Sequence, residues 1–154
     1  MRANQWIVAV ALLGSVTAPS RAQGVGGQWI IDFNRRVQNM NGVISESDPA
    51  RARMTLEVRG DSVTGTWVLI SPVEVQMPAP RTLRGTIANG EVHLVSDPFV
   101  VRMREDGEER EMKLRTSYSF KLEAGELRGT QVSRPEGQDD GPPPRPFVAK
   151  RESP

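Results

Sequence analysis

Apolar and polar residues alternate with a period of two along most of this chain. The clearest run covers residues 112–122, where Met, Leu, Thr, Tyr and Phe alternate with Lys, Arg and Ser. Residues 29–33 and 54–59 alternate in the same way. In an extended strand this pattern sends one set of side chains into a core and the other into solvent. No segment keeps a helical period, so the pattern predicts an all-β domain.

Turn signals divide the chain into about eight strands. The signals are dipeptides that favour tight hairpin turns, namely Gly60-Asp61, Asn89-Gly90, Asp106-Gly107 and Ala124-Gly125. A break or bulge is expected at Asp97-Pro98, because proline cannot donate a hydrogen bond to the ladder. The predicted strands cover residues 27–33, 53–59, 62–70, 81–88, 91–104, 109–123, 126–133 and 146–151.

The dipeptide Gly-Thr recurs within these strands, each time after an apolar–polar pair. The copies are Val63-Thr64-Gly65-Thr66, Leu83-Arg84-Gly85-Thr86 and Leu127-Arg128-Gly129-Thr130. A glycine inside a strand marks a place where the backbone must bend. Sequentially paired strands with such bends predict an antiparallel up-and-down β-barrel of about eight strands, closed by pairing of the last strand with the first.

Three stretches do not follow the strand pattern. Residues 34–52 form a long, polar stretch. Within it, Asn41-Gly42 predicts a turn, and Asp48-Pro49 could begin a single helical turn. Residues 71–80 contain three prolines. Residues 134–146 are so rich in Pro, Gly and Asp that we expect them to be disordered.

The first 22 residues have the features of a cleavable signal peptide. Arg2 precedes the apolar run from Trp6 to Leu13. Ser20 and Ala22 supply the small residues expected at the third-last and last positions before a signal-peptide cleavage site. The run is shorter than the roughly 20 residues of a transmembrane helix. We therefore expect cleavage after Ala22, a single barrel domain at residues 23–154 with no integral membrane segment, and a periplasmic or secreted protein.

Cysteine content and charge narrow the classes of function. The chain has no cysteine, which excludes disulfides, thiolate chemistry and cysteine-ligated zinc, and an exported chain without disulfides is typical of bacteria. Loss of Arg2 and Arg21 with the leader would change the net charge from +1 to −1. Nucleic-acid binding needs a basic surface, so it is not expected. No phosphate or dinucleotide motif occurs, so no cofactor is expected either.

No combination of residues predicts catalysis or a metal site. His93 is the only histidine, and its neighbours Val92 and Leu94 place it on the solvent side of a strand. The acidic residues between positions 105 and 111 lack the ligand spacing of a dedicated calcium loop. The adhesion-like sequence of residues 59–62 is also what a hairpin turn selects. We therefore expect a protein that is not an enzyme.

Inward positions of the predicted strands supply the candidate ligand-binding residues. These side chains could line a cavity at the open end of the barrel, or alternatively they could simply fill its interior. They are Trp29, Met54, Trp67, Met112 and Tyr118.

Four short motifs in the first half of the domain carry a resemblance to known small barrels. They are Gly27-Gln28-Trp29, Met54-Thr55-Leu56, Val63-Thr64-Gly65-Thr66-Trp67 and Leu83-Arg84-Gly85-Thr86. With them the chain resembles the avidin and lipocalin (calycin-type) group, and it is similar to exported bacterial β-barrel domains. The resemblance does not imply biotin binding, because Trp67 stands where avidins have a tyrosine that hydrogen-bonds the ligand.

Two hypotheses from different classes follow. In the first, the protein is an exported, non-enzymatic barrel that binds a small apolar or amphipathic ligand at its open end, with residues 71–80 as a lid. In the second, it is a protein-interaction module, such as a protease inhibitor or an envelope-complex subunit, with a filled interior. That module would act through the loops at residues 34–52 and 71–80.

Overall fold

The computed structural model describes residues 24–34, 36–40, 43–47, 49–71, 79–105 and 107–153. The predicted signal peptide lies outside the described residues, as does the central part of the proposed lid at residues 72–78.

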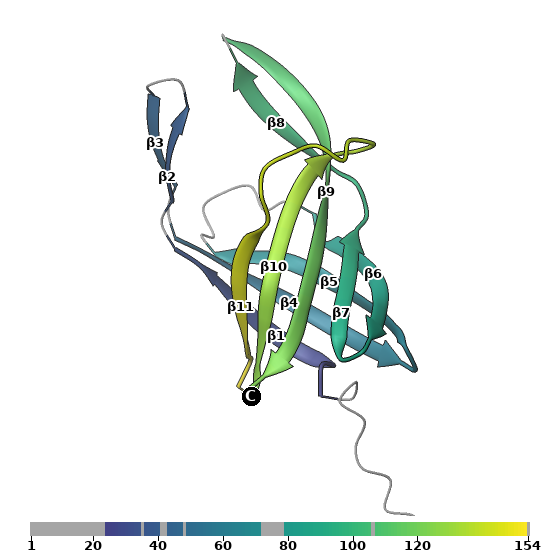
Figure 1. Ribbon diagram of the computed structural model, residues 1–154. Helices are drawn as coiled ribbons and strands as arrows, with labels where there is room; N and C mark the ends of the chain where they lie inside the picture. The colour runs from purple at the N-terminus through teal and green to yellow at the C-terminus, as the bar shows by residue number, and fades with distance from the viewer. Residues whose placement is uncertain are drawn as a thin grey trace, which may run out of the picture.

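The described residues form an all-β structure with antiparallel pairing throughout (Figure 1). Eight of the strands make a closed barrel in the order β1, β4, β5, β6, β7, β9, β10 and β11, and β11 pairs back onto β1. The fold prediction is therefore confirmed, including closure by the last strand on the first. The strands are β1 (Gly27–Phe33), β2 (Arg36–Met40), β3 (Val43–Ser47), β4 (Ala50–Arg59), β5 (Ser62–Ser71), β6 (Arg81–Ala88), β7 (Glu91–Ser96), β8 (Phe99–Glu105), β9 (Glu108–Glu123), β10 (Glu126–Pro135) and β11 (Arg145–Arg151).

Two-residue turns join several neighbouring strands where the dipeptide signals predict them. Asn89 and Gly90 have φ angles of 53° and 77°, and Ala124 and Gly125 have φ angles of 50° and 79°. Positive φ at both central residues is the geometry of a type I′ turn, whose twist matches that of the strands on either side. The turns at residues 60–61, 89–90 and 124–125 lie together at one end of the barrel (Figure 1).

The structure adds two hairpins that extend beyond the barrel wall (Figure 1). The stretch at residues 34–52 contains the hairpin of β2 and β3 rather than an irregular loop. The predicted strand at residues 91–104 breaks at Asp97-Pro98, as expected, into β7 and β8. Strand β8 then pairs with the first part of β9, whereas the second part of β9 belongs to the barrel.

The predicted disordered stretch at residues 134–146 overlaps two strands in the structure. Strand β10 continues to Pro135 and β11 begins at Arg145. The described residues between them, 136–144, contain no strand and pass over the same end of the barrel as the two hairpins (Figure 1).

Glycines of the three Gly-Thr repeats lie on the inner face of the barrel wall. Each follows a buried residue by two positions and is paired with a buried residue of the adjacent strand. A Cβ at Gly65, Gly85 or Gly129 would overlap a backbone carbonyl oxygen of that strand. The repeat therefore marks the positions where the curved wall has no room for a side chain.

A filled core closes the barrel at the end where the turns at residues 60–61, 89–90 and 124–125 lie. Trp29 is fully buried, and its Nε1 donates a hydrogen bond to the carbonyl oxygen of Val25 at 2.8 Å. The guanidinium carbon of Arg151 lies 4.3 Å from the centroid of the Trp29 ring. Arg151 also donates hydrogen bonds to the carbonyl oxygens of Gly24 and Gly26, at 2.6 and 3.1 Å. This end of the barrel is sealed by side chains and by the N-terminal turn.

Candidate functional site

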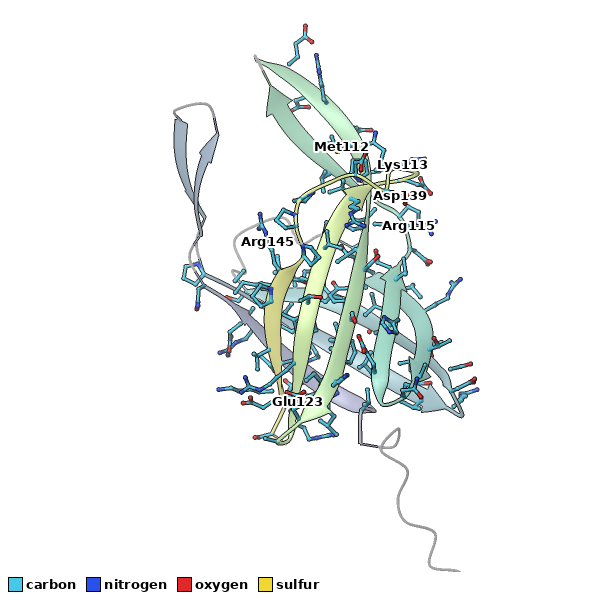
Figure 2. All side chains as sticks on the ribbon, viewed as in Figure 1. Met112, Lys113, Arg115, Glu123, Asp139 and Arg145 are labelled. Carbon is cyan, nitrogen blue, oxygen red and sulfur yellow. The ribbon has the colours of Figure 1, made fainter. Side chains whose placement is uncertain are left out.

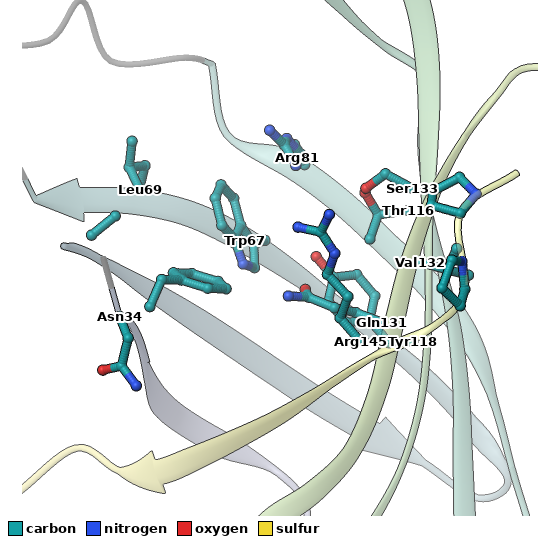
Figure 3. Close-up of a pocket in the computed structure, with 14 residues that line it drawn as sticks. Asn34, Trp67, Leu69, Arg81, Thr116, Tyr118, Gln131, Val132, Ser133 and Arg145 are labelled. Carbon is teal, nitrogen blue, oxygen red and sulfur yellow. The ribbon is translucent and has the colours of Figure 1, made fainter. Parts of the chain in front are cut away.

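A pocket of about 400 Å³ occupies the other end of the barrel (Figure 3). It is formed where β1 and β5 end, where β4, β6 and β11 begin, and beside the middle of β9 and β10. Its walls combine aromatic and aliphatic side chains with an equal number of polar ones, counting Tyr118 as polar. The lining residues are Phe33, Asn34, Ala50, Trp67, Leu69, Arg81, Thr116, Tyr118, Gln131, Val132, Ser133, Pro142, Pro143 and Arg145.

Arg81 is held in the pocket by aromatic rings. It pairs with Trp67 across β5 and β6, and it lies on the same strand face as the buried Leu83. Its guanidinium carbon lies 4.5 Å from the centroid of the Trp67 ring and 3.6 Å from that of Phe99. Both distances are within the range of cation–π attraction. Burial lowers the pKa of Arg81, yet an arginine retains its charge at neutral pH.

Two N–H groups of this pair are buried without an acceptor. Nε1 of Trp67 and Nε of Arg81 have no hydrogen-bond partner among the residues that the structure describes. Leaving a buried donor unsatisfied costs about 1–3 kcal/mol, so such groups usually mark a strained or functional position. The pocket therefore contains two donors, on paired residues, that the described part of the chain does not satisfy.

Hydroxyl groups line the side of the pocket formed by β9 and β10. Thr116 Oγ1 lies 2.8 Å from Ser133 Oγ, and the backbone N–H of Thr116 donates to Ser96 Oγ at 3.0 Å. Burial raises the pKa of Tyr118 to about 12, although Arg81 and a hydrogen bond with Thr116 act in the opposite direction. Tyr118 therefore presents a neutral hydroxyl group at physiological pH.

A second cavity of about 310 Å³ adjoins the pocket at the seam between β1 and β11. The two cavities share Phe33, Asn34, Gln131 and Arg145. The seam exists because β1 and β11 pair only over residues 29–31 of β1, whereas all seven residues of β1 pair with β4. The wall is thus opened at this end by the early separation of its first and last strands.

Of the five predicted ligand-binding residues, the structure brings two together at this pocket. Trp67 and Tyr118 line it, with 7 % and 3 % of their surface exposed. Trp29 and Met54 are fully buried in the core and line neither cavity. Met112 lies on the part of β9 that extends past the barrel, opposite Val101 of β8, and it lines neither cavity.

Sequence reasoning missed the two arginines of the pocket. Arg81 precedes Leu83 and Gly85 by two and four positions, so its inward direction follows from the same alternation that identified Trp67. Arg145 lies at the start of β11 and lines both cavities. Figure 3 shows Arg81, Arg145, Trp67 and Tyr118 around the pocket.

The other motifs form no site in the described part of the chain. The side chain of His93 is 55 % exposed and lies 3.7 Å from a carboxylate oxygen of Glu91, as its strand position predicts. Residues 60 and 61 form the tight turn between β4 and β5. Among the described residues there is no group of three or more His, Asp or Glu side chains placed to hold a metal ion. Nor do those residues include a helix that could cross a membrane.

Comparison with protein-family models, with curated proteins and with solved structures gives no significant match. The inferences about function therefore rest on the pocket and on the residues that line it.

Proposed function

We propose that this protein is an exported, non-enzymatic barrel that binds a small amphipathic molecule in the pocket at its open end. The observation that carries the proposal is the pocket of about 400 Å³, whose fourteen lining residues are half aromatic or aliphatic and half polar, counting Tyr118 as polar. Ligand sites of small molecules typically measure about 300–1,000 Å³ and combine apolar walls with polar groups that fix the orientation of the ligand. An eight-stranded barrel commonly holds one small guest at an open end. The likeness to avidins and lipocalins suggested in the sequence agrees with this use of the fold.

The chemistry of the pocket lining supports binding rather than catalysis. Its polar side chains are arginine, tyrosine, threonine, serine, glutamine and asparagine, with no carboxylate or histidine among them. An acid–base mechanism would need a group that gains and loses a proton near neutral pH. The lining residues offer amphipathic recognition instead, with apolar walls and fixed polar groups.

The test is binding of a neutral fluorescent dye, N-phenyl-1-naphthylamine, to the protein purified after export with its own leader. We expect dye fluorescence to rise and then fall as n-decanol displaces the dye. In Leu69→Trp, the larger side chain fills part of the pocket and dye affinity should fall by about tenfold or more. The matched control is Val95→Trp, because Val95 is 40 % exposed and does not line either cavity. Equal dye affinity in both variants would refute the assignment of the site.

A second candidate function is recognition of another protein by the ends of the hairpins. The observation that favours it is that β2–β3 and β8–β9 both project beyond the barrel at the pocket end (Figure 1). A variant in which a short glycine-serine linker replaces residues 36–47 should then no longer bind the partner protein, whereas Leu69→Trp should still bind it. If Leu69→Trp also lost that partner, binding would involve the pocket itself.

A further inference from the structure

We infer that the ligand of this pocket is an amphipathic carboxylate, whose anionic group is bound by Arg81 and Trp67 while its apolar body lies against the pocket walls. The inference rests on the proposed function, because it assigns the ligand class of the same pocket. It is carried by the unsatisfied donors, by the distribution of charge around the barrel and by the apolar lining.

The first argument is that the pocket offers donors without acceptors. Trp67 is more than nine-tenths buried, and its Nε1 has no partner among the described residues. Nε of the paired Arg81 is buried and has none either. Both groups can only donate, so the molecule that satisfies them must present acceptor oxygens. The neutral hydroxyl group of Tyr118, in the same pocket, can donate as well.

The second argument is that Arg81 has no carboxylate partner among the described residues, unlike most arginines on the outside of the barrel. Five of the outer arginines form salt bridges with carboxylates of the partner strand or a nearby loop: Arg51 with Asp32, Arg53 with Glu152, Arg84 with Asp97, Arg102 with Glu111 and Arg115 with Glu136. Arg134 and Arg151, outside the pocket, form no salt bridge with the described part of the chain either, but Arg151 donates to backbone carbonyl oxygens. Within the described pocket lining, neither Arg81 nor Arg145 forms a salt bridge, and there is no Asp or Glu. A buried charge without a partner is costly. An anionic ligand would remove that cost.

The third argument selects a carboxylate among anions. A guanidinium group presents its donors in a planar fork that matches the two oxygens of a carboxylate. Arg81 is half-buried, with its Nε fully covered, whereas Arg145 is exposed at the rim of the pocket. The single half-buried positive charge balances a monoanion, and a dianion would carry an uncompensated charge into apolar surroundings. Phe33, Leu69 and Trp67 then provide the contact surface for an apolar body.

The carboxylate could belong to a straight-chain fatty acid or to an aromatic acid, and the experiment separates the two. Dye displacement is measured with four probes: decanoate, n-decanol, decylammonium and 2-naphthoate. We expect decanoate to bind about tenfold to a hundredfold more tightly than decanol, as a charged hydrogen bond to an ionised group allows. Decylammonium should be the weakest of the three decyl compounds. The ratio of decanoate to 2-naphthoate affinity tells which apolar body the walls prefer.

Three variants test whether Arg81 and Trp67 cause the preference for decanoate over decanol. Arg81→Met keeps the length and apolar contacts of the side chain, and decanoate should then bind no better than decanol. Trp67→Phe removes the indole N–H but keeps a ring, and decanoate affinity should fall by about threefold to tenfold. The control is Arg84→Met, which removes one positive charge from the same strand at an exposed position outside the pocket. It should keep the full preference for decanoate.

The outcomes distinguish the inference from the function on which it rests. If the dye and every probe fail to bind, the proposed function is wrong. If decanol, decanoate and decylammonium bind equally, or if decylammonium binds best, the pocket is a ligand site but the carboxylate assignment is overturned. If Arg81→Met does not fold, the carboxylate assignment is still tested by two results. These are the order of affinity of the three decyl compounds for the wild-type protein and the effect of Trp67→Phe on decanoate affinity. A preference that Arg84→Met removes as well would show a general charge effect and overturn the assignment.

Discussion

Gly85→Ala tests whether the Gly-Thr repeat is present because the barrel wall cannot accept a side chain. A Cβ at this position would lie 2.7 Å from the carbonyl carbon of His93 and 2.9 Å from Cα of Leu94, on the paired strand β7. Carbon atoms in contact are normally about 3.5–4.0 Å apart. The added Cβ would also overlap the carbonyl oxygen of His93, so strands β6 and β7 would have to separate locally by more than about 1 Å.

This separation sets the expected loss of stability. Two ladder hydrogen bonds next to the substitution would be weakened, at about 1 kcal/mol each. Forcing an extra methyl group into a tight interior costs about 1–3 kcal/mol, and the lower entropy of the unfolded alanine chain returns about 0.4–1 kcal/mol. We expect the free energy of unfolding to fall by about 2–5 kcal/mol in total.

The assay is urea unfolding followed by the fluorescence of Trp29 and Trp67, with the slope of the transition checked against the wild type. Gly60→Ala is the matched control, because Gly60 has a φ of +64° but no atom within 4 Å of its added Cβ. The control measures the cost of left-handed backbone strain alone, about 1–2 kcal/mol. Were Gly85→Ala no more destabilising than Gly60→Ala, the steric explanation of the repeat would be wrong.

Two further predictions concern pH. Tyr118 is the only tyrosine, and burial raises its pKa to about 12, so phenolate absorbance should appear near pH 12 in the folded protein and near about pH 10 in urea. Because the pKa of Tyr118 is higher in the folded than in the unfolded protein, this group should leave stability constant below about pH 10. Stability should then fall as the pH rises from there through the folded pKa. A titration midpoint of Tyr118 near about pH 10 in the folded protein would contradict the burial of its hydroxyl group. Hydrogen bonds from Arg53, at 2.6 and 2.7 Å, lower the pKa of Glu152. That interaction stabilises the fold above the ordinary glutamate pKa of about 4.3 and is lost as the pH falls through the lower folded pKa. Glu152→Gln should therefore be less stable than the wild type in urea at neutral pH, and the difference should shrink in acid; a difference that does not change with pH would show that the carboxylate charge is not involved.

Local signals in the sequence carried most of the information about the barrel. Dipeptides such as Asn89-Gly90 adopt the positive φ values of a type I′ turn at little cost, so the strand ends on either side were predictable. The break at Asp97-Pro98 was predictable because proline lacks an N–H group. The β2–β3 hairpin was missed, since its sequence is short and largely polar and shows no sustained alternation of apolar and polar residues.

Alternation identifies the face of a strand but not the height of a residue along the barrel axis. Trp29 and Trp67 both point inward, yet Trp29 closes one end and Trp67 lines the pocket at the other. Met112 follows the same alternation as Tyr118, but β9 is longer than the barrel and carries Met112 beyond it. Arg81 was missed because charge usually places a residue in solvent, although its alternation with Leu83 places it on the inward face, where the structure shows it partly buried beside Trp67.

The pairing of Trp29 with Arg151 has a consequence for the order of events during synthesis. The strand that closes the wall is the last one made, so every earlier hairpin can form while the sheet is still open. Bringing together strands so far apart in the chain is slower than forming hairpins between neighbours. Until that moment β1 and β10 keep an unpaired edge, which can attract other chains. Because β11 is the last barrel strand along the chain, the wall stays open until β11 has been synthesised.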